Sequence, residues 1–150
     1  MAKRQERMYI GGDWTTTVDT FPDYNPSDGT VWANMPDAGV AETRAAIEAA
    51  HTAFPEWAAM PFNKRSHLMI KAGEIFESRR AEIAEAIQNE GGGWFGKAMF
   101  ETGYTAEIFP AAAAANYDSI GEVLPSEYGK LSMAVRRPMG VVSVISSWNF

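Results

Sequence analysis

The side chain best suited to take part in a reaction is the amide of Asn149, near the carboxyl end of the chain. It follows residues 141–145, a run of valine and isoleucine broken only by Ser143, which is typical of a strand covered on both faces. Open α/β sheets bind ligands just beyond the carboxyl ends of such strands. An amide N–H held there can donate to a developing oxyanion, and one such donor contributes roughly a hundred- to a thousandfold in rate. The alternative is a buried strand followed by an asparagine turn with no chemical role.

A second pattern lies between two helical stretches. Residues 91–97 read GGGWFGK, so Gly91, Gly96 and Lys97 fit the G-x-x-x-x-G-K pattern of a phosphate-binding loop. Ala98 occupies the position where that loop needs a hydroxyl for magnesium, and the preceding residues have a helical period where the loop needs a strand. We therefore favour a turn between two helices and keep a phosphate-binding NTPase as the alternative.

The histidine and aromatic side chains are better suited to packing than to catalysis or metal binding. His51 and His67 are the only histidines, and neither has a second ligand four residues away, so no metal site is expected. Phe100 and Tyr104 are four residues apart and share one face of a predicted helix. Such a pair either walls a pocket or packs in a core.

Composition excludes several classes of function. The 150 residues carry a formal charge of -6, which argues against a nucleic-acid partner or an anionic membrane surface. There is no cysteine, so no residue of this chain can act as a thiolate nucleophile or form a disulfide. The opening residues show no signal-peptide pattern and no later segment resembles a membrane span, so we expect a cytoplasmic protein that interacts with small molecules and protein partners.

The elements that must position these groups follow from periodicity and turn residues. We expect short strands over residues 9–14, 20–24 and 31–35, arranged as a hairpin or meander. An amphipathic helix capped by Asp37 should end near Phe54, because Pro55 disfavours helical geometry in the residue before it. Helical stretches should follow over residues 61–90, with a break at 79–80, and over residues 97–120, with a kink at Pro110.

The last thirty residues should hold a loop and two strands. We expect a loop over residues 121–128, a half-exposed strand over 131–135 and a turn at 137–140. Residues 141–145 then form the buried strand, which gives an α/β fold. That strand needs parallel neighbours, since a buried strand cannot leave its backbone groups unpaired.

Several segments, taken together, carry a family resemblance. YIGGDW, YNPSDGTVWANMPDA, AAHTAFPEWAAM, GEVLPS and PMGVVSVISSWNF occur in this order across residues 9–150. They resemble the amino-terminal part of the NAD(P)-dependent aldehyde dehydrogenases, and in detail the chain is most similar to the benzaldehyde and vanillin dehydrogenase branch. The resemblance implies a β-hairpin, amphipathic helices, a bridging hairpin near residues 129–140 and the first strand of a Rossmann-like sheet. Residues 1–150 would then be the amino-terminal portion of the NAD(P)-binding domain.

The same resemblance implies roles for single residues. By the match of the closing Trp-Asn-Phe, Asn149 is the oxyanion donor and Phe150 borders the substrate tunnel. Ile145, Ser146 and Trp148 would line the NAD or NADP dinucleotide. The helix that carries Phe100 and Tyr104 resembles the one that walls the substrate tunnel.

The resemblance also implies what this segment lacks. The family oxidises an aldehyde to the carboxylic acid through a cysteine thiohemiacetal, and its cysteine, its glutamate base and its catalytic domain would follow Phe150. We therefore expect the 150-residue chain alone to be inactive and the complete protein to be a homodimer or homotetramer that takes an aromatic aldehyde. The resemblance does not decide the branch of the family, because Ser147 occupies a position where many relatives carry proline. A non-catalytic fragment or assembly module is the alternative from another class.

Overall fold

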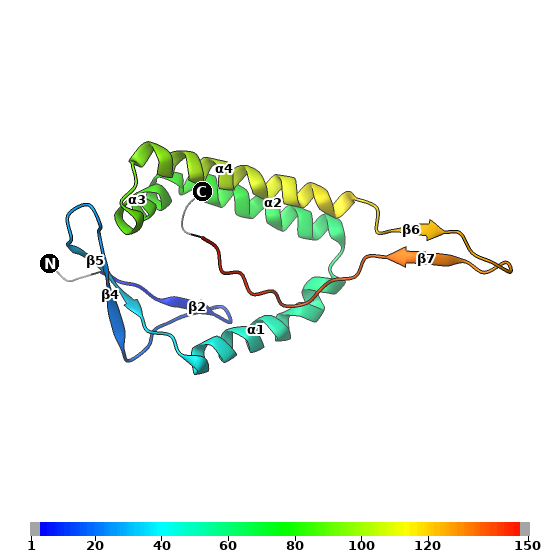
Figure 1. Cartoon of the computed structure of the whole chain (residues 1–150), viewed down its shortest axis with the longest axis horizontal. Coiled ribbons are helices and arrows are strands. Elements are labelled where there is room, and N and C mark those ends of the chain that lie inside the picture. Colours follow the sequence, from blue (N-terminus) through cyan, green and yellow to red (C-terminus); the bar gives the residue numbers. More distant parts are fainter. Residues whose placement is uncertain (1–3, 148–150) are drawn as a thin grey trace.

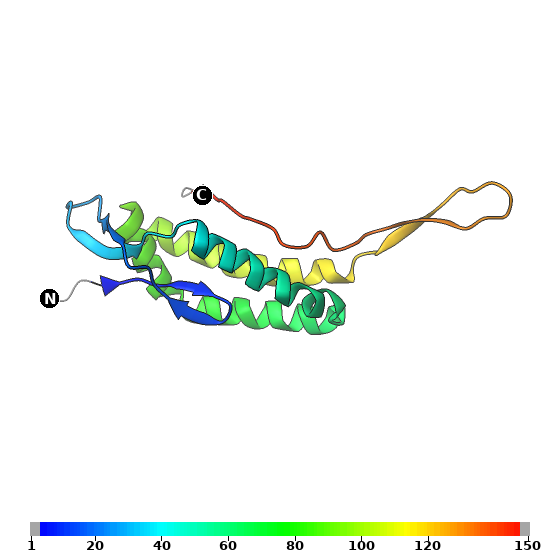
Figure 2. The same cartoon turned by 90° about the horizontal axis from the view of Figure 1, so that it is seen from below.

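The computed structural model describes residues 4–147 and shows an elongated molecule (Figure 1). The described residues include four α-helices. Helices from residue 62 onward form the main body, the first helix and small sheets lie beside them, and a long hairpin extends away from one end (Figures 1 and 2). None of the described helices is long and apolar enough to cross a membrane.

The amino-terminal strands form two small sheets. Strand β1 (Arg4–Gln5) runs parallel to β5 (Val31–Pro36), and β5 pairs antiparallel with β4 (Thr20–Tyr24). Strands β2 (Met8–Ile10) and β3 (Asp13–Thr15) form a hairpin. The turn between them has positive φ angles of 63° at Gly11 and 99° at Gly12, which glycine adopts without steric cost. The strands predicted from alternation and turn residues are confirmed.

Helix α1 (Val40–Ala59) begins and ends later than we predicted. Asp37 does not cap it. The cap is Gly39, whose backbone N–H donates to the carboxylate of Glu42 at 2.8 Å, as in a capping box. The helix also continues through Pro55, because the four residues after it, Glu-Trp-Ala-Ala, include good helix formers that keep helical geometry and outweigh the local restriction.

Helices α2 (Phe62–Ser78), α3 (Arg80–Gly91) and α4 (Phe95–Ala114) make up the helical body. The predicted break at residues 79–80 is confirmed, and Gly92 ends α3 in the left-handed conformation with φ of 67°. Helix α4 ends before residue 120, where we had placed its end, and a short 3-10 turn, Ala115–Tyr117, follows it.

Small residues let α2 and α4 approach closely. Gly73 of α2 faces α4, and a Cβ atom built on it would lie 2.9 Å from the Cβ of Phe109. Ala98, Thr102 and Ala113 of α4 are buried. The rings of Phe76 and Phe109 meet across this contact with centroids 5.9 Å apart. The α2 and α4 backbones are therefore fixed against each other by short side chains, with little room for rearrangement.

The predicted loop over residues 121–128 is wrong. Strand β6 (Gly121–Leu124) pairs antiparallel with β7 (Ser132–Val135), and the chain reverses through Tyr128 and Gly129, which have φ angles of 57° and 68°. A four-residue strand next to proline carries little periodic signal, and pairing with β7 decides its conformation. This hairpin spans residues 121–135, earlier than the bridging hairpin expected near residues 129–140, and it projects beyond the helices (Figure 1).

The predicted buried strand over residues 141–145 is also wrong for this structure. Residues 136–147 run back from the hairpin along the helical body (Figures 1 and 2), and those from 141 to 147 form no strand. Val144 and Ile145 are 80% and 97% exposed. No described residue pairs with this segment, and the β-branched pattern cannot form a strand without a partner ladder.

Candidate functional site

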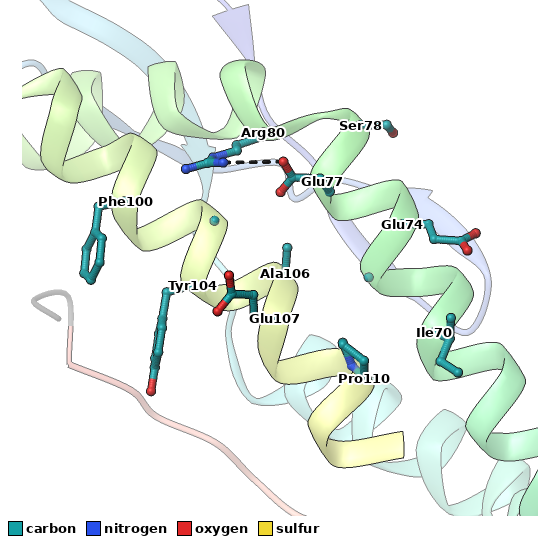
Figure 3. Close-up of a pocket in the computed structure, with 12 residues that line it drawn as sticks. Ile70, Glu74, Glu77, Ser78, Arg80, Phe100, Tyr104, Ala106, Glu107 and Pro110 are labelled. Carbon is teal, nitrogen blue, oxygen red and sulfur yellow. Dashed lines mark hydrogen bonds and ion pairs between the residues drawn. The ribbon is translucent and has the colours of Figure 1, made fainter. Parts of the chain in front are cut away.

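Helix α4 brings the two predicted substrate-binding aromatic residues together. Phe100 and Tyr104 lie one turn apart, with ring centroids 6.2 Å apart and planes inclined by 16°. They project from the side of α4 that faces away from α2 (Figure 3). Their exposed fractions are 56% and 47%, so the pair presents an aromatic surface and does not fill a core. Their common direction, predicted from the four-residue spacing, is confirmed.

An open cavity of about 720 Å³ adjoins this pair. Its walls come from α2, from the start of α3 and from α4, and include Ile70, Glu74, Arg80, Phe100, Tyr104 and Pro110 (Figure 3). The close approach of α2 and α4 fixes the two long walls. The cavity therefore combines apolar and aromatic surface with a few charged groups, as small-molecule sites do.

The charged groups of the cavity are mostly acidic. Glu74, Glu77 and Glu107 line it together with one arginine, Arg80. The Arg80 guanidinium lies 3.4 Å from a carboxylate oxygen of Glu77 and also donates two hydrogen bonds to the carbonyl oxygen of Met99, at 3.0 and 2.6 Å. Arg80 was not predicted as a site residue. Its place at the helix break was the only signal available, because its partner lies 19 residues away.

Residues 92–94 form the turn between α3 and α4 that we had favoured, while Gly91 ends α3 and residues 95–97 begin α4. Helix α3 precedes them where a phosphate-binding loop would need a strand, and Lys97 lies in the first turn of α4, where it forms an ion pair with Glu101. The ammonium group is thus directed to its own helix. The geometry gives no support to the NTPase alternative.

A group of charged residues lies where α3 ends near the amino-terminal sheet. Partial burial raises the pKa of Glu90, and the carboxylates of Asp23 and Glu6 raise it further, while Arg4 opposes them. Among residues 4–147, no group of three or more histidine, cysteine or acidic side chains is arranged to hold a metal ion.

The predicted cofactor residues are only partly described. Ile145 and Ser146 lie on the exposed extended segment before residue 148, where they offer an apolar side chain, a hydroxyl group and backbone groups outside any ladder. Their predicted role in lining a dinucleotide stays a prediction. Trp148, Asn149 and Phe150 lie outside the described residues, so their predicted roles stay predictions.

Comparison with known proteins gives a consistent result. Residues 14–150 match the sequence profile of the aldehyde dehydrogenase family. The mitochondrial succinate-semialdehyde dehydrogenase of Rattus norvegicus is 34% identical over 145 residues, which cover 95% of this chain and 27% of that protein. The vanillin dehydrogenase of a Pseudomonas species is 35% identical over 147 residues, covering 95% of this chain and 30% of that protein.

A solved structure agrees with the sequence matches. The NAD-dependent benzaldehyde dehydrogenase of Corynebacterium glutamicum superposes with a TM-score of 0.76 at 33% identity, over 82% of this chain and 27% of that one. The chain thus spans less than a third of the length of these relatives, and its fold is that of the amino-terminal part of aldehyde dehydrogenase structures. Since the profile covers nearly every residue, the chain belongs to the aldehyde dehydrogenase family.

Proposed function

We propose that this chain works with the residues that its relatives carry beyond the matched region, and that the complete protein oxidises an aromatic aldehyde to the carboxylic acid with NAD or NADP. Membership of the aldehyde dehydrogenase family supports the reaction type. The aromatic class is supported by relatives named vanillin and benzaldehyde dehydrogenase. The observation that carries it is the parallel, exposed pair of Phe100 and Tyr104 beside the cavity.

The charges of the cavity favour an aromatic aldehyde over a substrate with a carboxylate. A succinate-semialdehyde relative matches this chain about as well as a vanillin dehydrogenase does, so both substrate classes need to be weighed. Three of the four charged residues of the cavity, Glu74, Glu77 and Glu107, would repel a carboxylate. The fourth, Arg80, is already bonded to Glu77 and to the Met99 carbonyl. A planar, uncharged ring suits the aromatic faces better, because offset stacking stabilises it.

Further roles belong to the same proposal. Asn149 donates a hydrogen bond to the oxyanion, Phe150 borders the aldehyde, and Ile145, Ser146 and Trp148 line the dinucleotide. When bound, the nicotinamide dinucleotide supplies the acceptor for the hydride. The family resemblance supports these roles, and the exposed positions of Ile145 and Ser146 are compatible with them. The thiol nucleophile must lie outside this chain, which contains no cysteine.

Assembly and location complete the proposal. The β6–β7 hairpin projects from the body and exposes Leu131, Met133 and Val135 by 74%, 56% and 44% (Figure 1). We propose that it bridges subunits of a homodimer or homotetramer, where this apolar surface would be buried. A cytoplasmic location is part of the same proposal and is compatible with a chain that has no cysteine.

Steady-state kinetics of the complete protein test the substrate class. We expect Phe100→Ala and Tyr104→Ala each to raise KM for benzaldehyde by roughly threefold to tenfold while KM for acetaldehyde stays nearly constant, because only the ring loses its stacking surface. Ile75→Ala is the matched control, since Ile75 is 49% exposed on α2 and does not line the cavity. An unchanged ratio of the two KM values in both alanine variants, or a wild-type preference for succinate semialdehyde, would reject an aromatic substrate.

A further inference from the structure

The side chain of Arg80 joins two helices at the turn that carries the aromatic pair. Arg80 is the first residue of α3, and its guanidinium donates from Nε and Nη2 to the Met99 carbonyl of α4 at 3.0 and 2.6 Å. Hydrogen bonds from a charged donor are about twice as strong as neutral ones, and the two nitrogens fix the plane of the group. Met99 immediately precedes Phe100 in the sequence. The fixed point therefore lies next to the aromatic pair.

Gly103 creates the space that the guanidinium occupies. A Cβ atom at position 103 would collide with Nη2 and lie 2.6 Å from the central carbon of the guanidinium, so only glycine lets Arg80 lie this close to α4. Glu77 at the end of α2 holds Nη1 from the other side at 3.4 Å (Figure 3). Arg80 is thus held by contacts with α2 and α4.

The contact adds a constraint on α4 at the turn that carries the aromatic pair, beside the packing of α4 against α2. Met99 and Gly103 are one turn apart and meet Arg80, while Phe100 and Tyr104 are the residues that follow each of them. Successive residues of a helix are separated by about 100° around its axis, so fixing the first two directs the second two. Binding sites must hold their groups within about 0.5 Å and 10–20° of the productive geometry.

We infer that Arg80 is a positioning residue, which acts through Phe100 and Tyr104 to set the preference of the site for a ring-bearing substrate. The inference rests on the proposed function, since it assumes that this pair contacts the substrate. The competing explanation is that Arg80 only holds the helices together. The two explanations differ in one respect: a packing role changes the turnover of all aldehydes alike, whereas a positioning role changes only the selectivity.

Arg79 provides a matched control. It lies between α2 and α3, and its guanidinium pairs with Glu82 of α3 at 2.7 Å, with both side chains well exposed. Arg79→Gln and Arg80→Gln therefore remove the same charge one residue apart, and only the second removes a contact with α4.

The experiment measures KM and kcat for benzaldehyde and acetaldehyde in the complete protein. We expect Arg80→Gln to raise KM for benzaldehyde relative to acetaldehyde by at least about threefold, while Arg79→Gln leaves this ratio and kcat for both aldehydes unchanged. In a Tyr104→Ala background the effect of Arg80→Gln on this ratio should shrink toward onefold, because the residue acts through the pair. Gly103→Ala, which displaces the guanidinium and keeps its charge, should reproduce the selectivity change and provides the test if Arg80→Gln does not fold.

Each outcome decides the question. Equal losses for both aldehydes in Arg80→Gln, or an effect that persists fully without the Tyr104 ring, would overturn the inference and leave Arg80 as a packing residue. Failure of both Arg80→Gln and Gly103→Ala to yield folded protein would overturn it in the same way. If Phe100→Ala and Tyr104→Ala leave the selectivity unchanged, the proposed function fails first. If they change it and Arg80→Gln does not, only the present inference is rejected.

Discussion

Removal of the Ser66 hydroxyl should measure how firmly α2 holds the end of α4. Ser66 is 3% exposed, and its Oγ donates to the Ala113 carbonyl at 2.8 Å and accepts from the Asn116 amide at 3.1 Å. In Ser66→Ala both bonds are lost, but Asn116 keeps a bond of 3.3 Å to the same carbonyl. Each buried hydrogen bond contributes about 0.5–1.5 kcal/mol to the free energy of unfolding, and the higher helix propensity of alanine offsets about 0.5 kcal/mol of the loss. We expect a loss of about 1–2 kcal/mol in the free energy of unfolding.

Urea unfolding followed by circular dichroism provides the measurement, with the slope of the transition checked for constancy. Ser78→Ala is the control, because Ser78 is exposed on the same helix and, among residues 4–147, its hydroxyl donates only to the nearby Ile75 carbonyl at 2.7 Å. Its loss should change the free energy of unfolding by no more than about 0.5 kcal/mol. Equal changes in the two variants, or no interaction between Ser66→Ala and Asn116→Ala in a double-mutant cycle, would refute a polar link between α2 and α4.

Four further predictions follow from the charged group, the site and the hairpin. Glu90→Gln should raise the melting midpoint at about pH 7 and leave it unchanged at about pH 3. The pKa of Glu90 in the folded protein lies above its ordinary value, so the ionisation of Glu90 lowers the stability of the folded protein as the pH rises past the ordinary pKa. A lower midpoint in the variant near neutral pH would contradict this. In the complete protein, Asn149→Ala should lower kcat by roughly ten- to a thousandfold at nearly constant cofactor affinity. A wild-type kcat with a lowered melting midpoint would leave Asn149 as a turn residue. Met133→Glu should reduce the oligomeric state of the complete protein, whereas Val18→Glu should not, because Val18 is fully exposed and distant from the hairpin in sequence. Unchanged sedimentation of Met133→Glu would contradict a bridging role of the β6–β7 hairpin. The 150-residue chain alone should oxidise no aldehyde with NAD, because it contains no cysteine; measurable turnover by the purified chain would show that another nucleophile operates.

Local chemistry accounts for what the sequence predicted correctly. The turn at Gly11 and Gly12, the break before Arg80 and the end of α3 at Gly92 depend on the backbone preferences of a few neighbouring residues. The common face of Phe100 and Tyr104 follows from helical spacing alone. The family, too, was recognisable from the order of short motifs, and the profile match over residues 14–150 confirms it.

The two errors after residue 120 share one physical cause, which is that the missing information lay in pairing between strands. Strand β6 exists because β7 pairs with it, and the valine-rich segment from residue 141 forms no strand because no described residue pairs with it. Local signals also misplaced the ends of α1, which is capped by Gly39 and Glu42 and continues past Pro55.

The same division holds for the site. The sequence named the aromatic residues, but only the tertiary structure placed Arg80 against the Met99 carbonyl and Gly103, and only it put three carboxylates in the adjoining cavity. Spacing along one helix is fixed by covalent geometry and backbone hydrogen bonds. The distance between two helices is fixed by the side chains that meet between them, and here the absent Cβ atoms of Gly73 and Gly103 decide it.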